Sequence, residues 1–134
     1  DEQMRYLLIL PGIESNTKKL FEMWDNKQVR VDCERKSNFK PYLEKKTIIN
    51  KNLFTMRNDF TPLLLMQNER YIEIFKTLKD LNIDSYSISG TGSTIFCVMN
   101  KNEDFKESQK YLESSNDLVT LNVEAFEGWH FTFD

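Results

Sequence analysis

The spacing of apolar residues at the start of the chain predicts a strand followed by a helix. Residues 6–10 form a short continuous apolar run closed by a Pro-Gly pair, which is the pattern of a buried strand that ends in a turn. Ser15 or Asn16 can then cap a helix that continues to Asp25. The apolar residues of this helix recur at helical spacing: Leu20, Phe21 and Trp24.

The middle of the chain predicts one weak and one strong helix. Residues 26–51 are polar and basic with scattered aromatics, so only a short helix is expected there, around residues 39–46. Further on, Thr61 is a suitable N-cap and Pro62 fits the first helical position, so a long helix is expected to follow. Asn82 ends this helix. Its apolar residues lie on one face: Tyr71, Ile74, Phe75, Leu78 and Leu81.

After residue 82 the period of the pattern changes to that of strands. Residues 85–89 alternate and residues 94–99 are continuously apolar, and the four residues between them are few enough for an antiparallel hairpin. Asn102 can cap a helix to about Ser115, with three residues turned inward: Phe105, Tyr111 and Leu112. Residues 119–124 alternate as a further strand, and the aromatic tail 129–133 could add an edge strand.

This order of elements predicts an α+β fold in which an antiparallel sheet of about four strands carries helices packed on one face. The 134 residues fit a single domain, 1–134, and the 40% apolar and 29% charged residues are typical of a globular protein. The net charge of −3 would repel a phosphate backbone, so a nucleic-acid partner is not expected.

Cysteine usage and hydropathy predict a cytoplasmic protein. Cys33 and Cys97 lie far apart, and Cys97 sits in an apolar run where a buried thiol is more usual than a disulfide. No window approaches the roughly 18 to 20 apolar residues of a membrane span, and no secretory leader is visible. The chain starts at Asp1 without an initiator Met, which we interpret as a cut through a longer protein, although simple processing would look the same.

The stretch from Ser89 to Thr94 carries the clearest chemical signal. Gly90 and Gly92 can adopt positive φ and bring backbone N–H groups close to a bound anion, beside three hydroxyl donors. Taken alone, so short a motif favours a plain hairpin turn. It is neither a Walker loop nor a Rossmann fingerprint, because the required Gly-Lys-Ser/Thr and the third glycine before a helix are missing.

Three segments together resemble the C-terminal domain of the galactokinase, homoserine kinase, mevalonate kinase and phosphomevalonate kinase (GHMP) superfamily. Residues 87–97 resemble its third motif, Met56-Arg57-Asn58-Asp59 resembles its Asn-Asp element, and Leu10-Pro11-Gly12-Ile13 followed by Thr17 and Phe21 resembles the start of the domain. Within the superfamily the chain is most similar to the 4-diphosphocytidyl-2-C-methyl-D-erythritol kinases. The resemblance spans nearly all of the chain and is weakest over residues 26–51.

This resemblance implies a ferredoxin-like fold and a role in non-mevalonate isoprenoid biosynthesis. The family transfers the γ-phosphoryl group of ATP to a hydroxyl of its cytidine-diphosphate-bearing substrate. The aromatic residue that matches Phe21 stacks on cytosine there, which implies that Thr17, Phe21, Asn58 and Asp59 bind substrate. The glycine motif lies near the phosphates and comprises Ser89, Gly90, Thr91, Gly92 and Ser93.

The resemblance also implies partners outside this chain. The family's Gly-rich phosphate loop and its catalytic Lys and Asp are absent from the sequence, since they belong to an N-terminal kinase domain. ATP and Mg are therefore expected in the full-length enzyme and not tightly bound by this fragment, which should have no catalytic residue and no activity alone. The expected partners are a small-molecule substrate that bears a cytidine diphosphate and that N-terminal kinase domain. No association with a membrane is expected.

Two departures from the family leave alternatives open. Thr61 stands where the Asn-Asp element often continues to Glu, and Asn16 breaks the usual Ser-Thr pair before Thr17. The chain could instead be the equivalent domain of a mevalonate or homoserine kinase relative, or a non-catalytic α+β ligand-binding module. Without the resemblance, Phe21 would be interpreted as a core residue, and Asp59 as satisfying backbone N–H groups at a helix start.

The remaining candidates carry little chemistry. His130 is the single histidine and lies in the aromatic tail, which favours a structural or surface role over general base catalysis. No Cys or His pair has the spacing of metal ligands, so no metal site is expected. The basic residues between Lys27 and Lys51 are interpreted as a solvated face.

Overall fold

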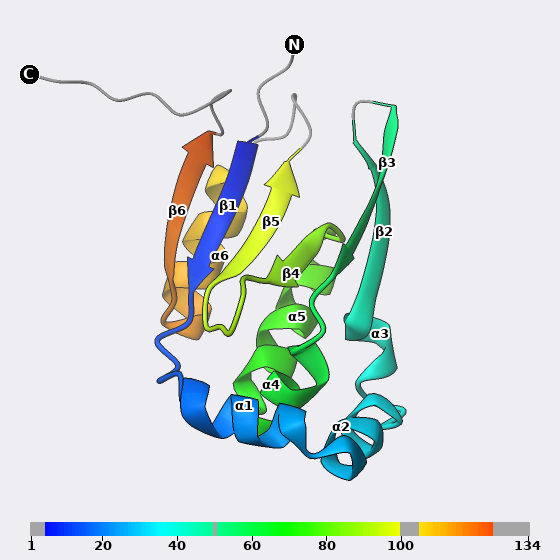
Figure 1. The fold of residues 1–134 in the computed structure, drawn as a ribbon. Coiled ribbons are helices and arrows are strands. Elements are labelled where there is room, and N and C mark those ends of the chain that lie inside the picture. Colours follow the sequence, from blue (N-terminus) through cyan, green and yellow to red (C-terminus); the bar gives the residue numbers. More distant parts are fainter. Residues whose placement is uncertain (1–4, 50, 100–104, 125–134) are drawn as a thin grey trace, which may run out of the picture.

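The computed structural model describes residues 5–49, 51–99 and 105–124, and its fold is α+β. A four-stranded antiparallel sheet has the strand order β4-β5-β1-β6, and a separate two-stranded hairpin pairs β2 with β3 (Figure 1). The strands of the larger sheet are β1 (Arg5–Leu10), β4 (Tyr86–Ile88), β5 (Ile95–Met99) and β6 (Val119–Glu124). This confirms the predicted fold class, sheet and antiparallel pairing.

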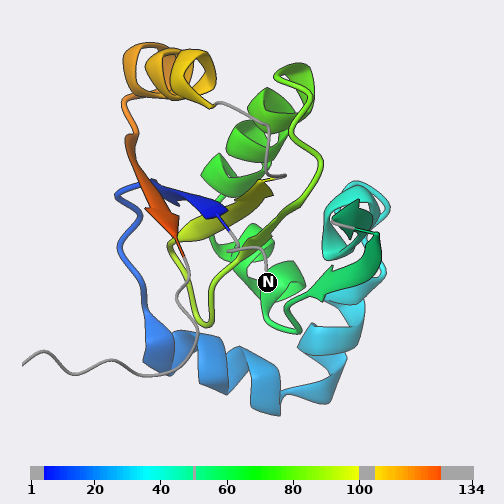
Figure 2. The same cartoon turned by 90° about the horizontal axis from the view of Figure 1, so that it is seen from above.

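Helices cover one face of the sheet and one of its ends. Helices α5 (Arg70–Asp80) and α6 (Lys106–Asn116) lie side by side on one face, which Figure 2 shows from above. Helices α1 (Thr17–Asp25), α2 (Lys27–Glu34) and α4 (Thr61–Gln67) gather at the end of the sheet where β1 finishes. The short α3 (Lys40–Leu43) leads from α2 into the hairpin.

The core forms between the central strands and the face of α5 that the apolar spacing predicted. Leu7 and Cys97 are paired across β1 and β5, and both are fully buried. Phe75 of α5 stacks on Tyr86 of β4, with ring centroids 4.8 Å apart. Of the five residues predicted on this face, Leu81 is only partly buried. The other four are buried: Tyr71, Ile74, Phe75 and Leu78. Burial also raises the pKa of the Cys97 thiol, which keeps it protonated, and both cysteines are free.

The first helix begins as predicted, whereas the long helix expected after Thr61 is two helices. Asn16 is the N-cap of α1, because its side-chain oxygen accepts a hydrogen bond from the N–H of Lys19 at 3.0 Å. Thr61 is the first residue of α4 and not its cap, which is Phe60. The break falls at Asn68, whose extended backbone ends α4 and whose side chain accepts from the N–H of Arg70 at the start of α5.

Residues 26–51 contain more structure than their composition predicted. Helix α2 was not expected, and the helix expected over residues 39–46 ends at Leu43, where β2 (Glu44–Ile49) begins and pairs with β3 (Asn52–Arg57). The turn contains Lys51 at φ 68° instead of the glycine that marks such turns. The facing residues Ile48 and Leu53 are both about two-thirds exposed (67% and 68%), so apolar residues stand on the more exposed side of the hairpin and the sequence lacks the apolar–polar alternation of a half-buried strand.

Two smaller expectations near the C-terminus are corrected. Tyr111 is 50% exposed and not turned inward, because the adjacent Leu112 takes the buried position on α6. In β6 the buried residue is Thr120, whose hydroxyl contacts Gln109 and Glu113 of α6, while Val119 and Leu121 are exposed. The expected cap Asn102, the edge strand at 129–133 and His130 lie outside the described residues. Within the part that the structure describes, no helix is long and apolar enough to cross a membrane.

We expect Phe75→Ala to lower the free energy of unfolding by about 3–5 kcal/mol, because it empties a fully buried site between α5 and β4. Urea denaturation followed by circular dichroism measures this loss. Tyr111→Ala is the matched control, since it removes an aromatic ring that is half exposed, and it should change the stability by no more than about 0.5 kcal/mol. Equal losses in the two variants would contradict the placement of the core.

Candidate functional site

The glycine loop, defined here as residues 89–94, joins β4 to β5 and holds its own shape. Gly90 (φ +53°) and Gly92 (φ +84°) both have positive φ, which confirms that the two glycines serve backbone geometry. Two internal hydrogen bonds close the loop: the N–H of Ser89 donates to the carbonyl of Thr94 (2.8 Å), and that of Gly92 to the carbonyl of Ser89 (2.9 Å). The described residues offer no acceptor to the N–H groups of Gly90, Thr91 and Ser93, which are therefore free for a ligand or water.

Asn58 fixes the start of this loop. Its Nδ2 donates to the carbonyl of Ile88 (2.8 Å) and to the carbonyl of Gly90 (2.6 Å). Its Oδ1 accepts from the N–H of Phe60 (3.0 Å), so both amide protons and the oxygen of this side chain are engaged with backbone. The predicted site residue thus lies at the glycine loop, but it positions the loop instead of presenting its amide to a ligand.

Ser15 holds the loop from another side. Its hydroxyl donates to the carbonyl of Thr91 at 3.3 Å, across a sequence separation of 76 residues. The turn after β1, the Asn-Asp element before α4 and the glycine loop therefore meet at one place in the fold. These are the three segments that the sequence singled out.

A cavity of about 540 Å³ opens beside the loop, between the end of β3 and β4. Four of the predicted site residues line it: Asn58, Asp59, Ser89 and Gly90. The other lining residues come from β3, the start of α4, β4 and β5: Thr55, Met56, Arg57, Phe60, Ser87, Ile88 and Phe96. Thr17, Phe21, Thr91, Gly92 and Ser93 are not among the lining residues, and Thr17 is an exposed residue in the first turn of α1.

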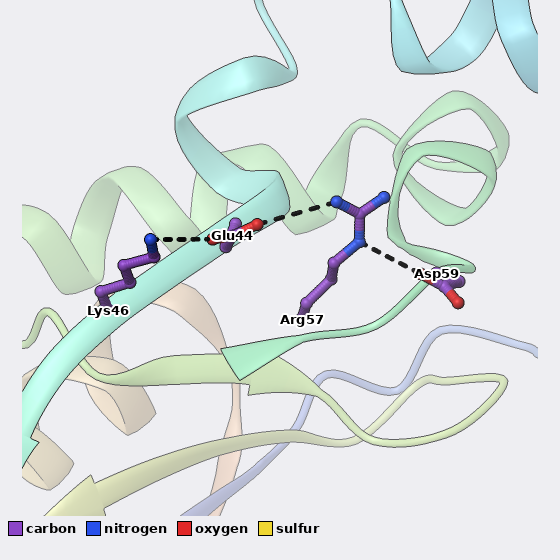
Figure 3. Close-up of polar contacts among 4 residues, drawn as sticks. All are labelled: Glu44, Lys46, Arg57 and Asp59. Atoms are coloured by element: carbon purple, nitrogen blue, oxygen red, sulfur yellow. Dashed lines mark hydrogen bonds and ion pairs between the residues drawn. The ribbon is translucent and has the colours of Figure 1, made fainter. Parts of the chain in front are cut away.

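The charged groups at this cavity neutralise one another. Arg57 is paired through Nε with Asp59 (3.1 Å) and through Nη1 with Glu44 (3.7 Å), and Glu44 also faces Lys46 at 3.7 Å (Figure 3). All four side chains are more than a third exposed, so these pairs contribute little to stability. The interpretation of Asp59 as a partner of backbone N–H groups is wrong, because Asn58 makes that contact and Asp59 bonds Arg57 instead.

Phe21 is half exposed and contacts Phe60, one of the residues that line the cavity. It is 47% exposed, whereas the neighbouring Leu20 is buried, so its interpretation as a core residue is wrong. Its ring meets that of Phe60 edge-on with centroids 5.4 Å apart, and Phe60 also contacts Trp24 at 5.1 Å. Phe60 lines the cavity and connects Phe21 to it. Nothing in the sequence distinguished Phe60 from an ordinary packing residue.

Tyr71 of α5 lies against the loop at Gly92. It is only 2% exposed, and its hydroxyl would lie 2.6 Å from a Cβ at Gly92, so that position has no room for a side chain. Burial raises the pKa of Tyr71 above its usual value. Sequence spacing predicted Tyr71 as a core residue of its helix and gave no sign of its contact with the loop.

The site is one of hydrogen-bond donors and aromatic faces. Within residues 5–49, 51–99 and 105–124, no group of three or more His, Cys, Asp or Glu side chains is placed to hold a metal ion. Comparisons of the chain with protein-family models, with curated proteins and with solved structures found no match.

We expect Gly92→Ala to destabilise the protein more than Gly90→Ala, by at least about 1 kcal/mol. Both changes place an L-residue at positive φ, which costs about 1–2 kcal/mol, but only a Cβ at Gly92 meets the Tyr71 hydroxyl, while the space around Gly90 is open. Urea denaturation of the two variants measures the difference. Equal destabilisation would contradict the close approach of the loop to Tyr71.

Asn58→Asp should loosen the glycine loop and cost about 1–3 kcal/mol, because it replaces two N–H donors by an oxygen that faces two carbonyl oxygens. Faster hydrogen exchange of the Ser89 and Gly92 amides reports the loosening. Asn68→Asp is the matched control, since an aspartate can still accept from the N–H of Arg70. Unchanged exchange in Asn58→Asp would remove Asn58 from its positioning role.

Proposed function

We propose that this chain is the C-terminal substrate domain of a GHMP-type kinase, which phosphorylates a hydroxyl of 4-diphosphocytidyl-2-C-methyl-D-erythritol in non-mevalonate isoprenoid biosynthesis. The observation that carries the proposal is the convergence of the three resembling segments on the glycine loop. Asn58 ties the second segment to the third, and Ser15 ties the first to the third. Segments that form one substrate cleft in the family are thus neighbours in this fold.

The loop offers donors suited to phosphate oxygens. The free N–H groups of Gly90, Thr91 and Ser93 lie in a segment whose shape is fixed by hydrogen bonds and by the two glycines. Donors fixed in place before the reaction stabilise the charge that develops on a transferring phosphoryl group without reorganisation. Such donors also add no charge of their own, which leaves the positioning of Mg-ATP to other groups.

Phe21 is the group proposed to recognise the cytosine ring. An exposed aromatic face can stack on a base and contribute about 1–3 kcal/mol. Phe21 is about half exposed, and it contacts Phe60, which lines a cavity of about 540 Å³, a size typical of small-molecule sites. Thr17 has no comparable support, since it lies on α1 without lining the cavity.

The remaining chemistry is assigned to an N-terminal kinase domain as partner. The carboxylate of Asp59 is exposed and paired with Arg57, which is a poor setting for a general base. The described residues fit phosphate oxygens at the glycine loop and supply no acidic cluster for Mg. ATP, Mg and the catalytic base are accordingly proposed to lie on that domain, and this chain alone should not phosphorylate the substrate.

In the full-length protein, we expect Phe21→Ala to raise the KM for the cytidine-bearing substrate by about 5- to 150-fold, the equivalent of the lost stacking. The KM for ATP should stay unchanged. Steady-state kinetics with each substrate varied in turn measures both constants, and Tyr111→Ala, which removes an equally exposed ring from α6, should change neither.

Three outcomes would contradict the proposal. An unchanged KM in Phe21→Ala removes Phe21 from the site. Phosphorylation of mevalonate or homoserine in place of the cytidine-bearing alcohol assigns the domain to another branch of the superfamily. Absence of any ATP-dependent phosphorylation by the full-length protein favours a non-catalytic ligand-binding module.

A further inference from the structure

A second cavity, of about 170 Å³, lies against the other contacts of the glycine loop and shares no lining residue with the first. We name it the Tyr71 cavity. Ser15, which bonds Thr91, lines it, and so does Tyr71, which approaches Gly92. The lining also includes four polar residues that could bond a ligand: Asn16, Lys19, Gln67 and Asn68.

The Tyr71 hydroxyl points to an occupant of this cavity. Tyr71 is only 2% exposed, yet its hydroxyl makes no hydrogen bond with any residue that the structure describes. The oxygen is not sealed inside the protein either, since no fully buried side-chain oxygen or nitrogen in the described part is unsatisfied. The hydroxyl therefore reaches the cavity with its hydrogen bond available to a ligand or water there.

The charge at the mouth of the cavity favours an anion as that partner. Asn16 and Lys19 place the N-terminal end of α1 there, where unpaired N–H groups and the helix dipole create positive potential. The Lys19 ammonium forms no ion pair with the described residues. Glu14 also lines the cavity and opposes an anion; it is exposed to solvent, as Lys19 is, so the opposite charges of these two residues are screened alike, and the Tyr71 hydroxyl and the start of α1 favour the anion.

We propose that the Tyr71 cavity binds a small oxyanion of about the size of phosphate, with the Tyr71 hydroxyl and the Lys19 ammonium as its donors. Because burial raises the pKa of Tyr71, the phenol remains protonated and able to donate at neutral pH. A volume of 170 Å³ exceeds what one water needs and is below the range of typical ligand pockets, which excludes a nucleotide. An anion there connects Lys19 of α1 with Tyr71 of α5, which approaches Gly92 of the loop. This proposal does not rest on the kinase function.

The test is a titration of the 134-residue chain with inorganic phosphate at constant ionic strength, followed by amide NMR. We expect saturable shifts at Lys19, Tyr71 and Gly92. Tyr71→Phe keeps the ring and removes the hydroxyl, and Lys19→Gln removes the ammonium; each should weaken binding about tenfold, because each deletes a hydrogen bond to a charged group. Lys18→Gln is the matched control, with the same charge change on a residue that does not line the cavity, and it should bind like the wild type.

The outcomes separate this site from the proposed kinase site. Shifts confined to Gly90, Thr91 and Ser93 would place the anion at the loop and overturn the proposal while leaving the kinase function intact. Absence of saturation would show that the cavity holds water only, and equal affinities in Lys19→Gln and Lys18→Gln would show that Lys19 is not a donor; either result overturns the proposal. Should Tyr71→Phe fail to fold, the two lysine variants decide the question by themselves.

Discussion

The side-chain amide of Asn58 is the interaction on which the arrangement of the site depends. Its two N–H groups hold the carbonyls of Ile88 and Gly90, and its oxygen holds the N–H of Phe60. No other neutral side chain of this length offers two donors and an acceptor in one plane. The end of β4, the start of the glycine loop and the start of α4 are thereby fixed together, and the larger cavity lies between them.

The loop is held from three directions, which gives its free N–H groups a fixed orientation. Asn58 holds its first residues, Ser15 holds Thr91, and Tyr71 leaves room only for glycine at position 92. Fixing donors before a ligand arrives removes part of the entropy cost of binding. A hairpin that served only to connect β4 and β5 would need none of these contacts, so the arrangement favours the interpretation of the loop as a binding element.

Sequence patterns predicted the parts of this protein that follow from burial. Periodicity located β1, β5 and the buried face of α5, because their apolar residues face one core. The hairpin of β2 and β3 escaped prediction since its apolar pair, Ile48 and Leu53, faces solvent and its turn lacks glycine. The break at Asn68 was missed because no proline or glycine marks it in the sequence.

The site could be located from sequence more readily than its residues could be given roles. The order of the three segments placed Asn58 near the glycine loop, but only coordinates show that its amide is fully engaged with backbone. Phe60 and Tyr71 were missed because an aromatic residue at helical spacing looks the same whether it fills a core or supports a loop.

The chemistry of the larger cavity is that of binding and orientation. Its charged residues are Arg57 and Asp59, which neutralise each other in an exposed position, and neither has the buried, unpaired setting that tunes a carboxylate for proton transfer. Its lining includes Gly90, whose N–H has no acceptor among the described residues, and Phe60, which contacts the half-exposed Phe21. Groups of this kind bind and orient a ligand, and this is the chemistry that the described residues around the cavity supply.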